Sequence, residues 1–132
     1  MHGETQEGAL GLQSALLDGE GFAHAFFTRQ GGVSGPPWDS LNLAASTGDD
    51  PEAVRENLAR AARRLGVPPG RVYFLSQVHG VAAKVLTGDE DREAVVYELG
   101  DITLSCVPGV ACGVRSADCV PILIGDRRTG AV

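Results

Sequence analysis

Residues 50–66 read DPEAVRENLARAARRLG, and this stretch specifies a helix at both of its ends. Asp50 offers an N-cap oxygen and Pro51 suits the first helical position, whereas Gly66 and Pro68 are typical of a helix end. The apolar side chains between them recur at spacings of four, three and four and form one stripe: Val54, Leu58, Ala61 and Leu65. The pattern predicts a helix that begins at Pro51 and packs one face on a core.

Strand candidates lie on both sides of this helix. A strand is expected at 22–28, before a Gly/Pro loop, and a second one at 72–78, with 81–86 as its hairpin partner across His79-Gly80. After an acidic surface loop at 89–93, four more candidates follow: 95–99, 102–106, 110–114 and 120–124. Runs of strands with a separate helix predict an α+β architecture rather than a regular alternation.

Composition and charge exclude several classes of protein. The chain has 132 residues, enough for one domain, and 43% of them are apolar. Its acidic start and short apolar runs predict no membrane segment and no signal peptide, so a cytoplasmic location is the default. With 11 basic against 17 acidic residues, no nucleic-acid binding is expected, and the arginine clusters 60–64 and 127–128 are interpreted as solvated surface.

Two segments bear on domain organisation. Residues 1–21 are interpreted as a loose N-terminal lead-in, and 22–132 as the folded part. At the other end, the turn 125–130 is followed by Ala131-Val132, where another apolar segment begins and stops. We therefore expect 22–132 to be the front part of a longer domain.

His79 and Cys119 are the first candidates for chemistry. His79 lies at a strand end beside Gly80, where it is either a metal ligand or base, or a surface turn histidine. Cys119 follows an aspartate and opens an apolar strand, as an exposed thiolate or as a small buried residue. Cys106 and Cys112 sit in apolar strand patterns and are expected to be buried. An odd number of cysteines without a secretory signal argues against a disulfide framework.

The loop 29–35 and Asn42 are further candidates. Arg29 precedes glycines whose backbone can approach a ligand closely, so it either holds an anion such as phosphate or is a solvated arginine in a turn. The loop fits neither a Walker motif nor a dinucleotide fingerprint. Asn42, between two leucines, is either a ligand contact or a satisfied buried amide.

Five motifs in the same order resemble the YfiH-like family, whose members are also called laccase-domain or polyphenol oxidase proteins, purine nucleoside phosphorylases and peptidoglycan editing factors. They are FFTRQGGVS at 26–34, SLNL at 40–43, GDDP at 48–51 with Glu56-Asn57, QVHG at 77–80, and ADCVP at 117–121. The resemblance covers about residues 22–132. It implies an α/β/β/α sandwich about twice as long as this chain, and hence an incomplete domain here.

The resemblance also implies a metal site. His79 matches the family's first ligand and Cys119 its second, while the third belongs to a His-Ala-Gly-Trp type motif expected after Val132. Such a donor set suits zinc, with copper as the alternative, and three protein ligands leave a position open for catalysis. The C-terminal half of the domain, or a second chain, is then expected to cover an exposed sheet edge.

The activities credited to the family are phosphorolysis of adenosine and inosine and deamination of adenosine, so a purine nucleoside and phosphate are the implied partners. Arg29 would contact phosphate or ribose, and Asn42 the substrate. Gln77 would support His79 or lie on a strand surface, and Asp118 would orient the site or cap a loop. The alternatives are a copper-dependent polyphenol oxidase, a cysteine hydrolase with Cys119 as nucleophile and His79 as base, and an inactive fragment.

Overall fold

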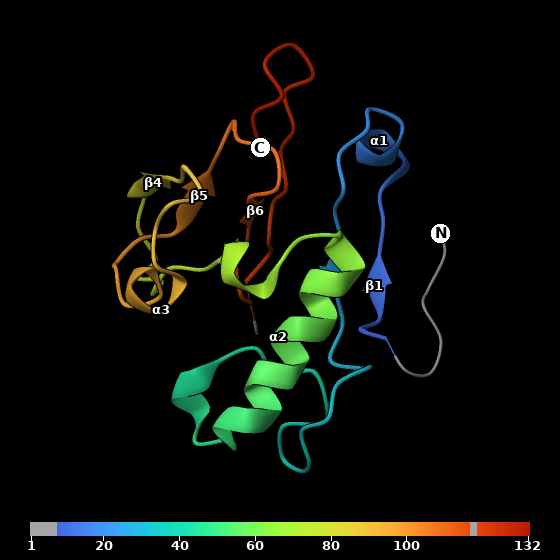
Figure 1. Cartoon of the computed structure of the whole chain (residues 1–132), viewed down its shortest axis with the longest axis vertical. Coiled ribbons are helices and arrows are strands. Elements are labelled where there is room, and N and C mark those ends of the chain that lie inside the picture. Colours follow the sequence, from blue (N-terminus) through green and yellow to red (C-terminus); the bar gives the residue numbers. More distant parts are fainter. Residues whose placement is uncertain (1–7, 117–118) are drawn as a thin grey trace. The chain divides into compact units, whose positions relative to one another are not determined.

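A computed structural model describes residues 8–116 and 119–132 of the chain, which form two compact units that divide between Pro69 and Gly70 (Figure 1). The described residues contain helices and three two-stranded sheets, one antiparallel and two parallel. This mixture confirms the predicted α+β class. No helix in the described part of the chain is long and apolar enough to span a bilayer.

Helix α2 (Pro51–Leu65) of the first unit confirms the predicted helix at both ends. The side chain of Asp50 accepts a hydrogen bond of 3.1 Å from the backbone N–H of Glu52. At the other end, Gly66 adopts a left-handed conformation with φ 77° and its N–H donates to the last carbonyls. The buried face holds Val54, Asn57, Leu58, Ala61 and Ala62. The predicted stripe is therefore the packed face, with one amide inside it.

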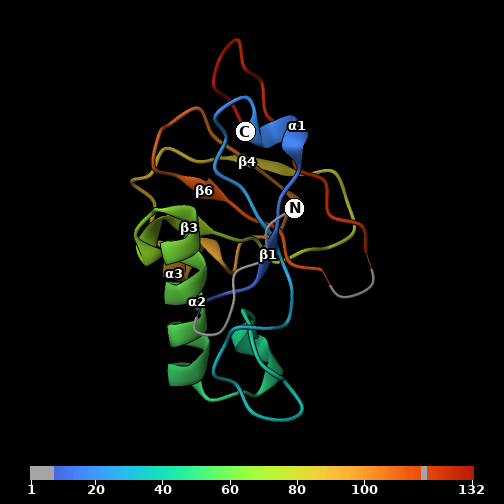
Figure 2. The same ribbon diagram turned by 90° about the vertical axis from the view of Figure 1, so that its right-hand side faces the viewer.

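Residues 11–18 do not form the loose lead-in that was expected. Strand β1 (Gly11–Leu12) pairs antiparallel with β2 (Phe26–Phe27), and helix α1 (Ala15–Asp18) lies between them in the chain (Figure 2). Two backbone bonds extend this pairing, because Leu10 donates to Gln30 and accepts from Thr28. The strand predicted at 22–28 is thus limited to β2, and its pairing partner is β1 in the segment before it. A 3₁₀ turn, η1 (Ala45–Thr47), precedes α2.

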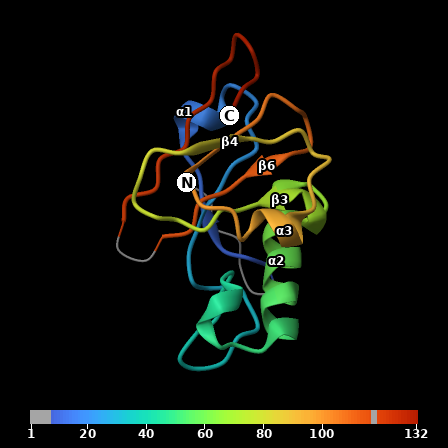
Figure 3. The ribbon, with the colours of Figure 1, turned by 90° about the vertical axis from the view of Figure 1, so that its left-hand side faces the viewer.

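The second unit has two parallel strand pairs. Strand β3 (Val72–Tyr73) pairs with β6 (Ala111–Cys112), and β4 (Ala83–Val85) pairs with β5 (Ile102–Leu104). The turn η2 (Pro69–Arg71) leads into β3, and helix α3 (Arg92–Val95) contacts β3 (Figure 3). The core consists of Tyr73, Leu75, Leu86, Val95 and Val110.

The predicted hairpin between 72–78 and 81–86 is wrong. Of the pair His79-Gly80, only His79 has positive φ, and the N–H groups of both residues donate to the side chain of Asp101. Strand β3 pairs with β6 and β4 pairs with β5, so the two segments are not each other's partners. The two strands instead pair with later segments.

Two further strand predictions are wrong. The first residue of the segment 95–99 is the last residue of helix α3. This helix is capped at its start by Asp91, whose side chain accepts a hydrogen bond from the N–H of Glu93. The segment 120–124 has no strand and runs as an irregular loop (Figure 2). Its side chains of Val120, Ile122 and Ile124 are 73–85% exposed, so they belong to no core of the described chain.

Candidate functional site

His79 lies in the loop between β3 and β4 with its side chain exposed to solvent. Its φ of 61° is left-handed, and it is the only non-glycine residue with positive φ in the part of the chain that the structure describes. This conformation costs an L-residue roughly 1–2 kcal/mol. The loop backbone must therefore be held by contacts from elsewhere in the fold.

Asp101 supplies those contacts. Its Oδ1 accepts from the N–H of Val78 at 3.1 Å and of His79 at 3.0 Å, and its Oδ2 accepts from the N–H of Gly80 at 2.7 Å. The bond from Gly80 is the largest cause that holds the pKa of Asp101 below its ordinary value. Sequence spacing offers no signal for Asp101, because it lies more than twenty residues after this loop.

The other predicted residues of the second unit are exposed where they are described. Gln77 and Cys119 both have exposed side chains. The backbone carbonyl of Cys119 accepts a hydrogen bond from the hydroxyl of Ser116. Asp118 lies outside the described residues. The structure therefore presents an imidazole and a thiol to solvent in this unit, as accessible donor groups.

The two cysteines expected to be buried differ from each other. Cys112, on β6, is half-buried, and burial is the largest cause that raises the pKa of its thiol to about 11. Cys106 is exposed, so that expectation is wrong for it. The reason is that β5 ends at Leu104, and Cys106 lies in the irregular segment that follows the strand.

Cys112 should resist alkylation. Its pKa of about 11 rather than 9.0 lowers its thiolate fraction at about pH 8 by roughly a hundredfold relative to an ordinary thiol. We expect iodoacetamide to modify the exposed Cys106 and Cys119 first, as peptide mass spectrometry would measure. If Cys112 in the folded chain is modified as fast as Cys106, its thiol is not buried with a raised pKa, and the prediction is wrong.

In the first unit, the loop around Arg29 is fixed through its backbone. The carbonyl of Arg29 accepts from the N–H of Ser40 at 2.6 Å and of Leu41 at 2.7 Å. Its side chain is exposed. The loop thus has a defined conformation and presents a guanidinium group to solvent, an arrangement that an anionic ligand can use.

The amide of Asn42 is used within the protein. Its Nδ2 donates to Thr47 Oγ1 at 2.8 Å and to Asp49 Oδ2 at 3.1 Å, and its Oδ1 accepts from the N–H of Ala44 at 3.1 Å. Of the two interpretations that the sequence left open, these contacts favour the satisfied amide. A substrate could bind this amide only by replacing contacts that order the segment before α2.

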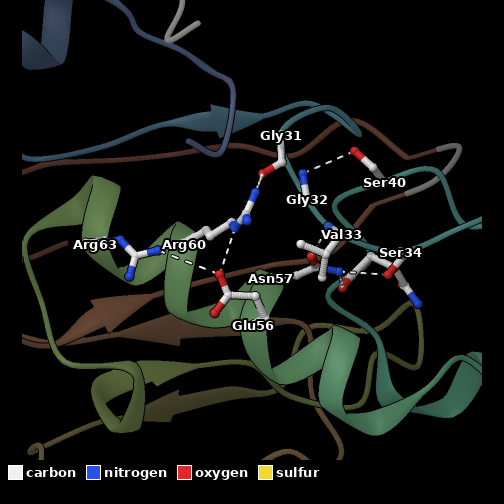
Figure 4. Close-up of polar contacts among 10 residues, drawn as sticks. Gly31, Gly32, Val33, Ser34, Ser40, Glu56, Asn57, Arg60 and Arg63 are labelled. Carbon is white, nitrogen blue, oxygen red and sulfur yellow. Dashed lines mark hydrogen bonds and ion pairs between the residues drawn. The ribbon is translucent and has the colours of Figure 1, made fainter. Parts of the chain in front are cut away.

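Asn57 is the centre of the polar cluster in this unit, and sequence reasoning did not single it out. It is fully buried; its Oδ1 accepts from the N–H of Val33 at 2.8 Å, and its Nδ2 donates to Ser34 Oγ at 2.8 Å and to the carbonyl of Asn42 at 2.9 Å (Figure 4). The sequence feature that indicates its burial is its position on the apolar face of α2, three residues after Val54. A buried amide with these bonds ties the helix to two loops.

Ser34 connects Asn57 to a buried carboxylate. Ser34 Oγ donates to Asp49 Oδ2 at 2.5 Å, and the backbone N–H of Asp50 donates to Asp49 Oδ1 at 2.7 Å. The hydrogen bond from Ser34 is the largest cause that lowers the pKa of Asp49 from 3.8. Asp49 therefore stabilises the fold in its ionised form.

This shift predicts a pH dependence. Because the pKa of Asp49 is lower in the folded than in the unfolded chain, its stabilisation is present above 3.8 and is lost as the pH falls through the folded value. We expect stability to fall more steeply for the wild type than for Asp49→Asn between about pH 5 and about pH 3. Urea midpoints measured across this range test it, and parallel curves would contradict it.

The arginine cluster 60–64 was predicted to be solvated surface, and this prediction is wrong for Arg60. Its side chain is 22% exposed; its Nε donates to Glu56 at 2.8 Å and its Nη1 to the carbonyl of Gly31 at 3.1 Å (Figure 4). The bond from Arg60 is the largest cause that lowers the pKa of Glu56. Arg63, in contrast, is exposed. One arginine of the cluster thus links α2 to the glycine loop.

The candidate residues therefore fall into two groups. The first unit holds Arg29 and Asn42, and the second holds Gln77, His79 and Cys119. Within residues 8–116 and 119–132, no three His, Cys, Asp or Glu side chains gather as a metal site. The described chain accordingly presents separate donor groups. The backbone around His79 is held by three hydrogen bonds to Asp101.

Comparisons with known proteins agree with the motifs. Over 103 residues the chain is 43% identical to a purine nucleoside phosphorylase of Mycobacterium tuberculosis, covering 78% of this chain and 40% of that protein. Over 110 residues it is 44% identical to the purine nucleoside phosphorylase YfiH of Escherichia coli, covering 82% and 42%. The chain thus spans about two fifths of the length of these relatives.

The fold has solved counterparts. The crystal structure of a Neisseria meningitidis protein of the DUF152 family superposes with a TM-score of 0.65 at 37% identity, over 81% of this chain and 41% of that one. The incomplete coverage agrees with the expected incomplete fold. The family model described as "multi-copper polyphenol oxidoreductase laccase" matches residues 23–132. The chain therefore belongs to this laccase-like family, which is the YfiH-like family that its motifs resemble.

Proposed function

We propose that residues 11–132 are the N-terminal part of one domain of a zinc-dependent purine nucleoside enzyme, to which they contribute His79 and Cys119 as metal ligands. The proposal rests chiefly on one observation: an exposed imidazole lies on a loop whose backbone is fixed by three hydrogen bonds. The identity with proteins named purine nucleoside phosphorylase supports the substrate class. The reactions would be phosphorolysis of adenosine and inosine and deamination of adenosine.

The two donor groups fit zinc. An imidazole and a thiolate form a borderline-soft pair, and both side chains are accessible because both are exposed. A zinc ion held by them and by a third ligand would act as a Lewis acid on a bound oxygen. The role of His79 and Cys119 would be to fix the position of that ion, with Gln77 beside His79 as a supporting group.

The exposed guanidinium of Arg29 would bind phosphate or the ribose. Its loop is held by the two backbone bonds to Ser40 and Leu41, so the charged group would be presented from a defined support. Asn42 would keep this loop region ordered, and it would contact the substrate only by exchanging one of its internal hydrogen bonds. Asp118, next to Cys119 in the chain, would orient the site.

The exposed apolar side chains of Val120, Ile122 and Ile124 would be covered by a further segment of the same domain or by a second chain. About three fifths of the length of the curated relatives lies outside the match to this chain. That part would also supply the third ligand. A stable, monodisperse monomer of these 132 residues in solution would contradict this assignment.

The test is zinc content together with turnover of adenosine and inosine, measured for the product of the whole reading frame that contains this chain. His79→Ala and Cys119→Ala should each lower zinc content at least tenfold and turnover by two orders of magnitude or more. Cys106→Ala is the matched control, because Cys106 is also exposed and lies outside the proposed site. Retention of zinc and turnover in both site variants would refute the proposal.

The description of the matching family favours a copper-dependent polyphenol oxidase as the second candidate. Multicopper sites need several histidines. Of the two histidines within the described residues, His24 is buried, and its Nε2 accepts from the N–H of Ser14 while its Nδ1 bonds the carbonyl of Phe22. Among the described residues, His79 therefore carries the accessible imidazole. Phenol oxidation that requires added copper, with no nucleoside turnover, would favour the oxidase.

A further inference from the structure

We propose that Asp101 is a positioning residue that fixes the backbone of Val78–Gly80 and thereby the direction in which the imidazole of His79 leaves the loop. The inference deepens the proposed function, since it rests on His79 being the metal ligand. It assigns to one carboxylate the task of holding a ligand without touching the metal.

The contacts converge on a single side chain. Three consecutive N–H groups point to the two oxygens of Asp101, at 2.7–3.1 Å. Consecutive amides can share one carboxylate in this way only if the loop curls around it, and the left-handed φ of His79 provides that curl. If these bonds were lost, His79 would relax toward negative φ and its Cβ would point elsewhere.

Asp101 is itself placed by the strands that flank it. Its own N–H donates to the carbonyl of Ala82 at 3.1 Å, and that of Ile102 donates to the same carbonyl at 3.2 Å, directly before β5 pairs with β4. On the other side, Ser76 donates to Glu98 at 2.8 Å and accepts from Gly100 at 2.9 Å. The segment 98–102 therefore closes the His79 loop at both ends, and Asp101 holds its middle.

The close approach between these segments leaves little freedom. A Cβ built on Gly100 would lie 2.9 Å from Leu75 Cδ1 and 3.2 Å from the carbonyl oxygen of Ala82. The chain before Asp101 is thus packed against both ends of the His79 loop. The backbone that carries Asp101 therefore cannot shift away from the three amides without breaking these contacts.

Asp101→Ala and Asp101→Asn in the whole chain test the inference. The alanine variant removes all three acceptor bonds, whereas the asparagine variant keeps one oxygen and should give an intermediate effect. Asp126→Asn is the matched control, because Asp126 accepts from the N–H of Arg128 at 2.9 Å and from Thr129 Oγ1 at 2.8 Å in a different loop. Three readouts apply: amide hydrogen exchange at residues 78–80, the backbone φ of His79 from NMR couplings, and zinc affinity by competition with a chromophoric chelator.

We expect Asp101→Ala to raise amide exchange at 78–80 at least tenfold, to shift φ of His79 to negative values, and to weaken zinc binding about 10–100-fold. The control should match the wild type. If Asp101→Ala does not fold, the smaller effects of Asp101→Asn decide the question. Unchanged exchange and φ would overturn the inference, and so would zinc affinity within twofold of the wild type despite a shifted loop.

The two proposals fail in different ways. If the wild-type chain takes up no zinc, the proposed metal role is wrong. If the His79 loop nevertheless changes in the Asp101 variants and not in the control, the positioning by Asp101 is still supported. Zinc uptake that is lost in His79→Ala but kept in Asp101→Ala would support the metal role and overturn the positioning.

Discussion

Gly32→Ala should destabilise the first unit by about 3 kcal/mol or more, because a side chain there has no room. A Cβ on Gly32 would lie 2.1 Å from the carbonyl oxygen of Ser40, 2.5 Å from Leu41 Cα and 2.6 Å from Asn57 Oδ1. Two of these atoms belong to the backbone, so no rotamer change relieves the contact. The backbone bonds from Ser40 and Leu41 to Arg29 would be displaced with them.

Urea unfolding followed by the fluorescence of Trp38 measures this effect, since Trp38 is the single tryptophan of the chain and lies in the same unit. Gly35→Ala is the matched control. It lies three residues further along the same loop, has no positive φ, and would meet nothing within 4 Å. Its expected change is within about 0.5 kcal/mol. Equal stability of the two variants would show that the loop is not packed as described.

Asn57→Ala should cost about 3–5 kcal/mol of unfolding free energy. The substitution removes three hydrogen bonds of 2.8–2.9 Å from a fully buried position. It also leaves the N–H of Val33 and the carbonyl of Asn42 without this partner, and an unsatisfied buried polar group costs more than the net value of the bond that it loses.

Arg63→Ala on the same helix serves as the control, because the side chain of Arg63 is 68% exposed and its change should stay within about 0.5 kcal/mol. Asn57→Leu separates polarity from volume. If the hydrogen bonds matter, leucine should be about as damaging as alanine, although it refills the space. A leucine variant as stable as the wild type would mean that volume alone holds this position.

Helix α2 was predictable because all its signals are local. The cap at Asp50, the stop at Gly66 and the apolar stripe each involve residues within a few positions of one another. The strands were predictable only in part. Their pairing joins residues far apart in the chain, and an apolar run such as 120–124 has the composition of a strand although no partner orders it in the described chain.

The candidate site divides in the same way. His79, Cys119 and Arg29 were found because short motifs mark them. Asp101 was not found, since its role consists of bonds to amides more than twenty residues away. Asn57 stood within a recognised motif, but its function as the buried link between helix and loops depends on three partners from two other segments.

The sequence by itself determined the α+β class, the helix at 51–65, the family and the residues with reactive side chains, because these depend on residue type, local spacing and motif order. Only the tertiary structure decided how those side chains are held: the left-handed backbone of His79, the carboxylate that faces its loop, and the buried amide under the glycine loop. The physical reason is that a hydrogen bond depends on distance and direction in space, and neither can be read from separation along the chain.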